Sequence, residues 1–170
     1  NQFLIAMPSL DGSYFGRSVT YICEHDDQGA MGLVINKATE LSVSKLLTEI
    51  KVHKEENPLL IDQRVYSGGP VQTDRGFVLH KGGRQWSSSL KLKNDIIVTT
   101  SKDILESLSA EQGPKDFILT LGYAGWGAGQ LEQEIVDNAW LTIDADPELI
   151  FHPPIEQRWE KAVQKLGIDI

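Results

Sequence analysis

The chain has 170 residues, of which 41% are hydrophobic and 24% are charged, and its formal net charge is −8. A chain of this length and composition is expected to fold as one globular domain spanning residues 1–170. No apolar run approaches the ~20 residues of a transmembrane helix, and an acidic chain lacks the basic surface that nucleic-acid binding requires.

A β-hairpin is predicted in the first third of the chain. Residues 17–23 alternate between apolar and polar side chains, and residues 30–35 are apolar on both faces, as in a central strand. The polar residues 24–29 between them contain a glycine and form the expected turn. Ser42 then has the position of an N-cap for a helix, and the charged residues 51–58 form a loop that ends in proline. The apolar face of this helix consists of Val43, Leu46, Leu47 and Ile50.

The middle of the chain alternates between short strands and a helix. The predicted strands are residues 64–67, 76–80 and 95–100. A Gly68-Gly69-Pro70 break follows the first of them. Ser101 is placed to cap a second helix, which Gly113-Pro114 ends. The inward positions of that helix are Ile104, Leu105 and Leu108.

The last third begins with a buried strand at residues 117–121, which is followed by a glycine-rich segment at residues 122–129 and a short helix from Gln130. A strand at residues 139–143 follows, and Asp146-Pro147 opens a further turn of helix. A final amphipathic helix starts near Pro154 and ends at Gly167, with Ile155, Trp159, Val163 and Leu166 on its apolar face. Hairpins outnumber strand-helix-strand crossovers, so the sequence predicts an α+β fold with a mainly antiparallel sheet.

The glycine-rich residues 122–129 admit two interpretations. A glycine-rich approach to a helix can bind phosphate through free backbone N–H groups. The spacing does not match either standard phosphate-binding motif, because Gln130 stands where the dinucleotide motif needs glycine and no Gly-Lys-Ser/Thr is present. The alternative is a tight bend against the sheet, anchored by Tyr123 and Trp126. Gly68-Gly69-Pro70 has the same ambiguity between a bend and a ligand contact.

Cys23 and His25 share a face by strand alternation, so a cysteine–histidine nucleophile is a testable hypothesis. The acidic neighbours Glu24, Asp26 and Asp27 oppose it, because a reactive thiolate needs a cationic environment. The histidines and the cysteine have no metal-ligand spacing, and no Gly-x-Ser-x-Gly elbow is present. We therefore expect no metal and no cofactor.

Cys23 is the single cysteine, which rules out an internal disulfide and fits a reducing compartment. The apolar residues 3–6 are too short for the core of a signal peptide and have no basic residue before them. These observations predict a cytoplasmic protein that does not enter a membrane.

Six runs of sequence, spread in order over nearly the whole chain, resemble the AlgH/YqgE family of bacterial proteins. They are Ala6-Met7-Pro8, residues 18–25 (SVTYICEH), residues 29–36 (GAMGLVIN), residues 67–71 (SGGPV), residues 75–80 (RGFVLH) and residues 122–132 (GYAGWGAGQLE). One departure is Gly12-Ser13 after Asp11, where the family pattern has proline close to the aspartate.

The resemblance implies an α+β fold in which a bent or split sheet curls into a partial barrel with helices packed outside. It implies no settled activity, since the family is largely uncharacterised. One branch carries the label of transcriptional regulator of alginate synthesis. Direct DNA binding is not expected here, because the charge balance opposes it and no helix-turn-helix pattern is evident.

Three functional hypotheses follow. The favoured one is a non-enzymatic regulatory protein that binds a small ligand; its candidate binding residues are Arg17, His25, Asn36, Gly68, Gly69, Arg75, His80, Tyr123, Trp126 and Gly127. The second is an enzyme acting on a small polar or phosphorylated metabolite, with His25 or His80 as general base and Arg75 holding an anionic group. The third is a protein–protein interaction module whose acidic last third meets a basic partner. No catalytic residue is assigned.

Overall fold

The computed structural model describes residues 2–52, 60, 62–82, 86–110 and 112–167. Most of the loop expected at residues 51–58 lies outside these residues. The strands are β1 (Gln2–Ala6), β2 (Val19–Asp26), β3 (Gly29–Val34), β4 (Ala38–Ser42), β5 (Arg64–Ser67), β6 (Val71–Lys81), β7 (Ser89–Lys91), β8 (Ile96–Thr99), β9 (Phe117–Gly127) and β10 (Trp140–Asp144). The helices are α1 (Val43–Glu49), α2 (Lys102–Ser109), α3 (Gln130–Val136), α4 (Pro147–Phe151) and α5 (Arg158–Lys165), with short 3-10 helices at Pro8–Leu10 and Ile155–Gln157.

These strands form one curled sheet in the order β10-β1-β2-β3-β9-β6-β8-β7, and β4 and β5 attach to β9 through β5. Among the described residues, every strand pairing is antiparallel except that of β5 with β9. The predicted α+β class with a bent, mainly antiparallel half-barrel and helices outside is therefore confirmed.

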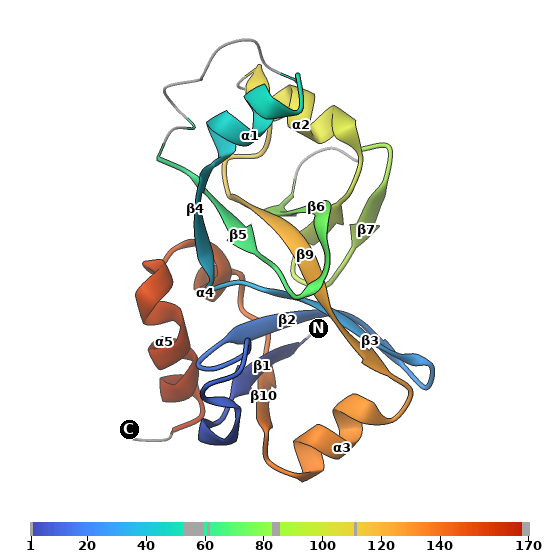
Figure 1. Ribbon diagram of the computed structural model, residues 1–170, viewed down its shortest axis with the longest axis vertical. Helices are drawn as coiled ribbons and strands as arrows, with labels where there is room; N and C mark the ends of the chain where they lie inside the picture. The colour runs from blue at the N-terminus through green and yellow to red at the C-terminus, as the bar shows by residue number, and fades with distance from the viewer. Residues whose placement is uncertain (1, 53–59, 61, 83–85, 111, 168–170) are drawn as a thin grey trace.

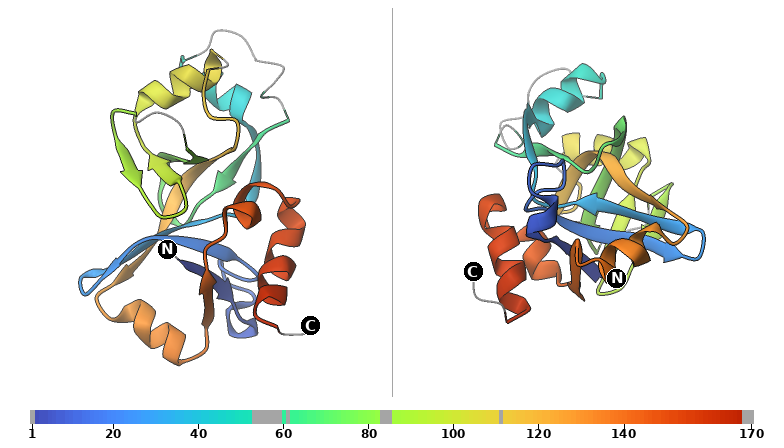
Figure 2. Two further views of the ribbon diagram at one scale, coloured as in Figure 1. Left: turned by 180° about the vertical axis from the view of Figure 1, so that it is seen from behind. Right: turned by 60° about the horizontal axis from the view of Figure 1, so that its bottom comes forward.

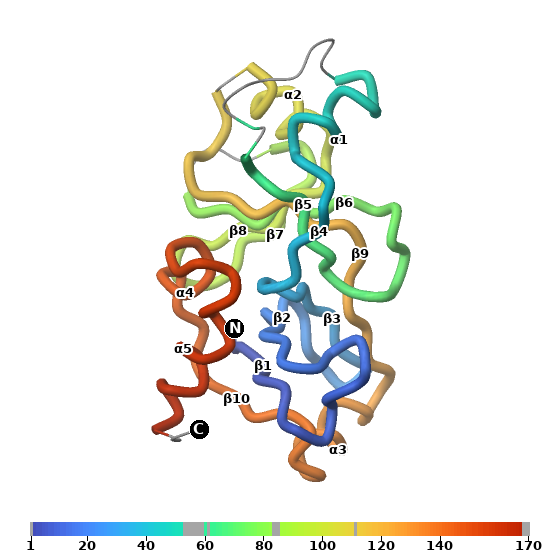
Figure 3. The backbone as a smooth tube through the Cα atoms, turned by 60° about the vertical axis from the view of Figure 1, so that its left-hand side comes forward, coloured from blue at the N-terminus to red at the C-terminus, as the bar shows by residue number. Residues whose placement is uncertain are grey.

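The long strand β9 joins the two halves of the sheet (Figure 1). Its first half pairs with β5 and β6, and its second half pairs with β3. Helices α1 and α2 cover one end of the molecule and α3 covers the other, as the views in Figure 2 agree. Helix α5 packs against β1 and β2 (Figure 3). None of the helices in the described parts of the chain is long and apolar enough to cross a bilayer.

Several local predictions hold. The hairpin of β2 and β3 forms, and the Ser42 side chain accepts a hydrogen bond of 3.0 Å from the Lys45 N–H at the start of α1. Ser101 precedes α2, but its hydroxyl donates to Asp103 instead of capping the helix. The strands β1, β4 and β7 are additions to the prediction.

One interpretation of the glycine-rich segment was a tight bend, and this is wrong for most of its length. Strand β9 continues through it to Gly127, and the chain turns only at Ala128 and Gly129 before α3. The strand persists because β3 pairs with it along this stretch, with Gly29 opposite Gly127 and Met31 opposite Gly125.

The two glycine-rich segments are placed against each other. Strands β5 and β6 pair with the same part of β9, one parallel and one antiparallel, so they occupy its two opposite edges. The connection Gly68-Gly69-Pro70 therefore passes directly across the backbone of β9 (Figure 1). A Cβ built on Gly69 would lie 1.9 Å from the carbonyl carbon of Tyr123, and one on Gly68 would lie 2.4 Å from the Gly122 oxygen. Glycine is needed at this crossing because two backbones touch there.

Candidate functional site

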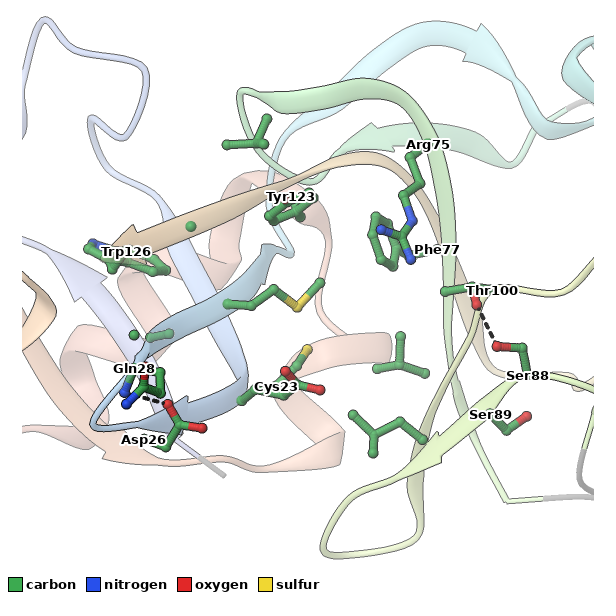
Figure 4. A pocket seen from close by; sticks show the side chains of 18 residues that line it. Cys23, Asp26, Gln28, Arg75, Phe77, Ser88, Ser89, Thr100, Tyr123 and Trp126 are labelled. Atoms are coloured by element: carbon green, nitrogen blue, oxygen red, sulfur yellow. Dashed lines mark hydrogen bonds between the residues drawn. The ribbon is translucent and has the colours of Figure 1, made fainter. Parts of the chain in front are cut away.

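A cleft of about 780 Å³ opens where the sheet bends. One wall is the β2–β3 hairpin, the other consists of β6, β7 and β8, and β9 runs between them (Figure 4). The apolar lining side chains include Cys23, Met31, Phe77, Val98 and Tyr123. The polar lining side chains include Glu24, Asp26, Arg75, Ser88 and Thr100. An apolar floor with few polar groups at its edges is the usual composition of a small-ligand site.

Gly125 leaves part of the floor without a side chain. It lies opposite Met31 in the β3–β9 register, on the same face of β9 as Tyr123. A Cβ at Gly125 would meet only the Cε2 of Tyr123, at 3.4 Å, which is ordinary van der Waals contact. The space above this glycine is therefore open to a ligand.

Arg75 is the cation of the cleft. Its guanidinium carbon lies 5.1 Å from the centre of the Phe77 ring, and both side chains come from β6 (Figure 4). Within the described residues, Arg75 forms no salt bridge and no side-chain hydrogen bond. A guanidinium held over a ring keeps its forked N–H donors available for a carboxylate or a phosphate.

The predicted common face of Cys23 and His25 is wrong. A β-bulge between Ile22 and Glu24 shifts the pairing with β3, so the alternation that the prediction assumed is broken there. Cys23 is buried at the cleft floor, whereas the His25 Nε2 lies 2.9 Å from the Glu132 carboxylate of α3. Burial, aided by the charge of Glu24, raises the pKa of the Cys23 thiol to about 12. A thiol in this environment stays protonated at neutral pH, so it is not an activated nucleophile.

His80 is fully buried on β6 and does not line the cleft. Its Nε2 lies 2.8 Å from the Thr99 hydroxyl and its Nδ1 lies 3.2 Å from the Gly82 carbonyl oxygen. Burial lowers the pKa of His80, although the bond to Gly82 and the charge of Asp95 partly offset this. Neither histidine that was considered as a general base therefore faces the cleft.

The burial of His80 predicts acid sensitivity. The folded state binds the His80 proton less readily than the unfolded state, whose pKa is near 6.5. The free energy of unfolding is therefore expected to fall as the pH drops below that value. Urea denaturation at pH 7.5 and 5.5 measures this loss, and His80→Asn, which does not titrate, should reduce it. An equal loss in the His80 variant would contradict the assignment.

Two further candidate residues form a separate group. The Arg17 guanidinium carbon lies 4.3 Å from the centre of the Trp159 ring on α5. The Asn36 side chain accepts a 2.9 Å hydrogen bond from the Val19 N–H and donates one of 3.0 Å to the Arg17 carbonyl. These contacts hold the β1–β2 loop against the rest of the fold, and neither residue lines the cleft.

The three candidate glycines have backbone roles. Gly68 and Gly69 form the crossing over β9, and the Gly127 N–H donates to the Gln130 side chain at 3.0 Å. Of the ten candidate residues, the cleft thus brings together the side chains of Arg75 and Tyr123. Trp126 borders the cleft, but its side chain lies on the opposite face of β9, where it packs against Trp140 and its Nε1 donates to the Glu134 carboxylate at 3.1 Å. Sequence reasoning missed Glu24, Asp26 and Met31 as lining residues, although all three lie in the predicted hairpin. The polar, glycine-containing turn at residues 24–29 indicated that this part of the hairpin is exposed. It did not indicate which other strands the hairpin faces.

Among the residues that the structure describes, no three histidine, cysteine or acidic side chains are close enough to hold a metal ion. The described geometry therefore provides an amphipathic cleft with one cation and two carboxylates.

A curled, mainly antiparallel sheet with helices outside defines the α+β half-barrel class of this protein. The family model DUF179, described as AlgH-like, matches residues 3–170, and the chain belongs to this family. This confirms the resemblance seen in the six sequence runs.

Similar proteins extend over the whole chain. A UPF0301 protein of Pseudoalteromonas translucida is 55% identical over 170 residues, which cover 100% of this chain and 92% of the relative. One of Thioalkalivibrio sulfidiphilus is 54% identical and is covered to 90%. The solution structure of the AlgH protein from Pseudomonas aeruginosa superposes with a TM-score of 0.86 at 46% identity, covering 99% of this chain and 88% of that one. A protein of Corynebacterium diphtheriae shares the fold, with a TM-score of 0.76 at 22% identity, covering 96% of this chain and 85% of that one.

Proposed function

We propose that this protein is a non-enzymatic, cytoplasmic regulatory protein that binds a small ligand in the cleft between the β2–β3 hairpin and β6–β8. The observation that carries the proposal is the convergence of Arg75, Phe77 and Tyr123 around an open glycine floor. These residues come from two distant parts of the sequence, and a cavity of this size accommodates a metabolite-sized molecule.

The positions of the reactive groups favour binding over catalysis. Cys23 reaches the cleft but carries a thiol with a pKa of about 12, and His25 and His80 face elsewhere. An enzyme that uses either histidine as a general base therefore has less support from the geometry.

The charges of the cleft also bear on its partners. Glu24 and Asp26 line the wall opposite Arg75, and the whole chain carries a net charge of −8. Phosphate backbones require clustered Lys and Arg, so we infer that a regulatory role of this protein acts through a small molecule or another protein and without direct DNA contact.

A ligand screen with a blocked cleft tests the proposal. Gly125→Leu is expected to fill the floor without strain, because its Cβ has only one ordinary contact. A ligand at 100 times its Kd stabilises a protein by about 2.7 kcal/mol, which raises the Tm of a domain of this size by roughly 5–10 °C. Thermal-shift measurements against a metabolite panel should give shifts in the wild type that are lost in Gly125→Leu.

Gly127→Leu is the matched control, since Gly127 lies on the same face of β9 but outside the cleft. A Cβ there would come no closer than 4.0 Å to the Gln130 side chain. Shifts that survive Gly125→Leu would place the ligand elsewhere. The absence of any shift would move support to the protein–protein interaction module, for which capture experiments at low and high salt are the next step.

A further inference from the structure

We propose that the cleft selects a dipolar ligand, in which a cationic group and a carboxylate are joined by an apolar body. This inference rests on the proposed function, and it specifies the chemistry of the ligand. It arises from one arrangement: Arg75 lies on one wall, Glu24 and Asp26 lie on the other, and apolar side chains separate them.

The Arg75 wall suits a single carboxylate. The guanidinium rests on Phe77 and, among the described residues, has no acidic partner. The neighbouring Ser88 and Thr100 hydroxyls bond to each other at 2.9 Å and face the same side of the cleft (Figure 4). A carboxylate can accept two parallel hydrogen bonds from the guanidinium fork, and hydroxyl groups can satisfy its remaining lone pairs.

The hairpin wall suits a cation. In the part of the chain that the structure describes, Glu24 forms no salt bridge, and Asp26 accepts a hydrogen bond of 2.8 Å from the Gln28 N–H at the turn. The Glu24 charge acts at the cleft floor, because it contributes to the raised pKa of Cys23. Two carboxylates near an apolar floor attract an ammonium or guanidinium group more strongly than a neutral donor.

The charge balance argues against a multiply charged anion. The three charged side chains of the lining, Arg75, Glu24 and Asp26, sum to one negative charge, and the net charge of the whole chain is −8. A phosphate group would gain one cation but would be repelled by the rest of the protein. A zwitterion avoids this repulsion and matches both walls. The apolar side chains of Met31, Phe77 and Tyr123 between the walls fit an apolar body.

Short peptides with free termini provide the probe. We would titrate zwitterionic di-, tri- and tetrapeptides that contain phenylalanine, together with the same peptides acetylated at the amino end, amidated at the carboxyl end, or both. Isothermal titration calorimetry gives Kd for each peptide. At the best length, loss of either charge is expected to weaken binding by about fivefold or more.

Variants assign each charge to its wall. Arg75→Gln should abolish the effect of amidation but preserve that of acetylation, and Glu24→Gln should do the reverse. The controls are Lys81→Gln on β6 and Asp27→Asn in the hairpin turn, since both side chains are exposed and lie outside the cleft. Comparing the effect of each variant on each blocked peptide separates a specific contact from a general change in the charge of the protein.

The outcomes distinguish this inference from the proposed function. If the doubly blocked peptide binds as tightly as the free peptide and Gly125→Leu abolishes both, the cleft binds ligands but the dipolar inference is overturned. If no peptide binds while the metabolite panel gives shifts that depend on Gly125, the inference is again overturned and the proposed function stands. If binding of the free peptide survives Gly125→Leu, both are contradicted.

Discussion

Replacing Gly69 with alanine is expected to cause the largest loss of stability among single substitutions at the β9 crossing. The added Cβ would lie 1.9 Å from the Tyr123 carbonyl carbon, 2.1 Å from its oxygen and 2.3 Å from the Ala124 nitrogen. All three atoms belong to a backbone that pairs with β3 or β6, so it cannot move without disturbing the sheet. We expect a loss of about 3 kcal/mol or more in the free energy of unfolding, measured by urea denaturation.

The control is Gly76→Ala on β6. The nearest atoms to a Cβ there are 3.9 Å away, and the position has an ordinary strand conformation. Alanine in a strand loses less conformational entropy than glycine on folding, so the change should be neutral or stabilising by up to about 1 kcal/mol. Equal free energies of unfolding for the Gly69 and Gly76 variants would contradict the close approach of the two backbones at the crossing.

The second large effect is expected at Arg158, the first residue of α5. Its side chain is 4% exposed and donates to three acceptors from separate parts of the chain. The Nη1 lies 2.6 Å from the Ile35 carbonyl oxygen and 2.9 Å from the Tyr66 hydroxyl, and the Nε lies 3.1 Å from the Pro153 carbonyl oxygen. Arg158→Met would leave these acceptors buried without the donor and should cost about 3 kcal/mol or more of unfolding free energy.

A double-mutant cycle separates the hydrogen bonds from packing. Tyr66→Phe alone should cost about 1 kcal/mol, and the two substitutions together should cost less than their sum, because they remove the same contact. Arg17→Met is the control, since Arg17 is exposed and stacks on Trp159, the residue after Arg158. Arg17→Met should lower the free energy of unfolding by no more than about 1 kcal/mol. Additive costs for Arg158 and Tyr66 would contradict the contact.

Several features of this fold were predictable from local sequence. The alternation in residues 17–23 and the glycine-containing turn after it give the β2–β3 hairpin, and Ser42 gives the start of α1. Strand β1 was missed because it is buried between β2 and β10, so its run of apolar residues shows no alternation. Strand β7 was missed because three residues are too few for a periodic pattern.

The candidate site was predictable only in part. Arg75 and Tyr123 stood out because a basic and an aromatic residue lay beside glycines, and the structure places both side chains on the cleft. Trp126 stood out for the same reason, but its side chain packs on the other face of β9. Arg17, Asn36 and His80 stood out for their chemistry in the same way, but their polar groups are engaged in contacts within the fold. A single sequence cannot separate these two groups, because side chains of the same type serve both roles.

By itself, the sequence determined the α+β class, the family, most of the strands and helices, and the acidic charge that disfavours nucleic acid. Only the tertiary structure decided that β9 continues through its glycines, that Gly69 crosses it, and that a bulge separates Cys23 from His25. It also placed Arg75 across the cleft from Glu24. Periodicity and capping depend on neighbours within a few residues, whereas these features depend on pairing between segments up to about a hundred residues apart, which no local pattern specifies.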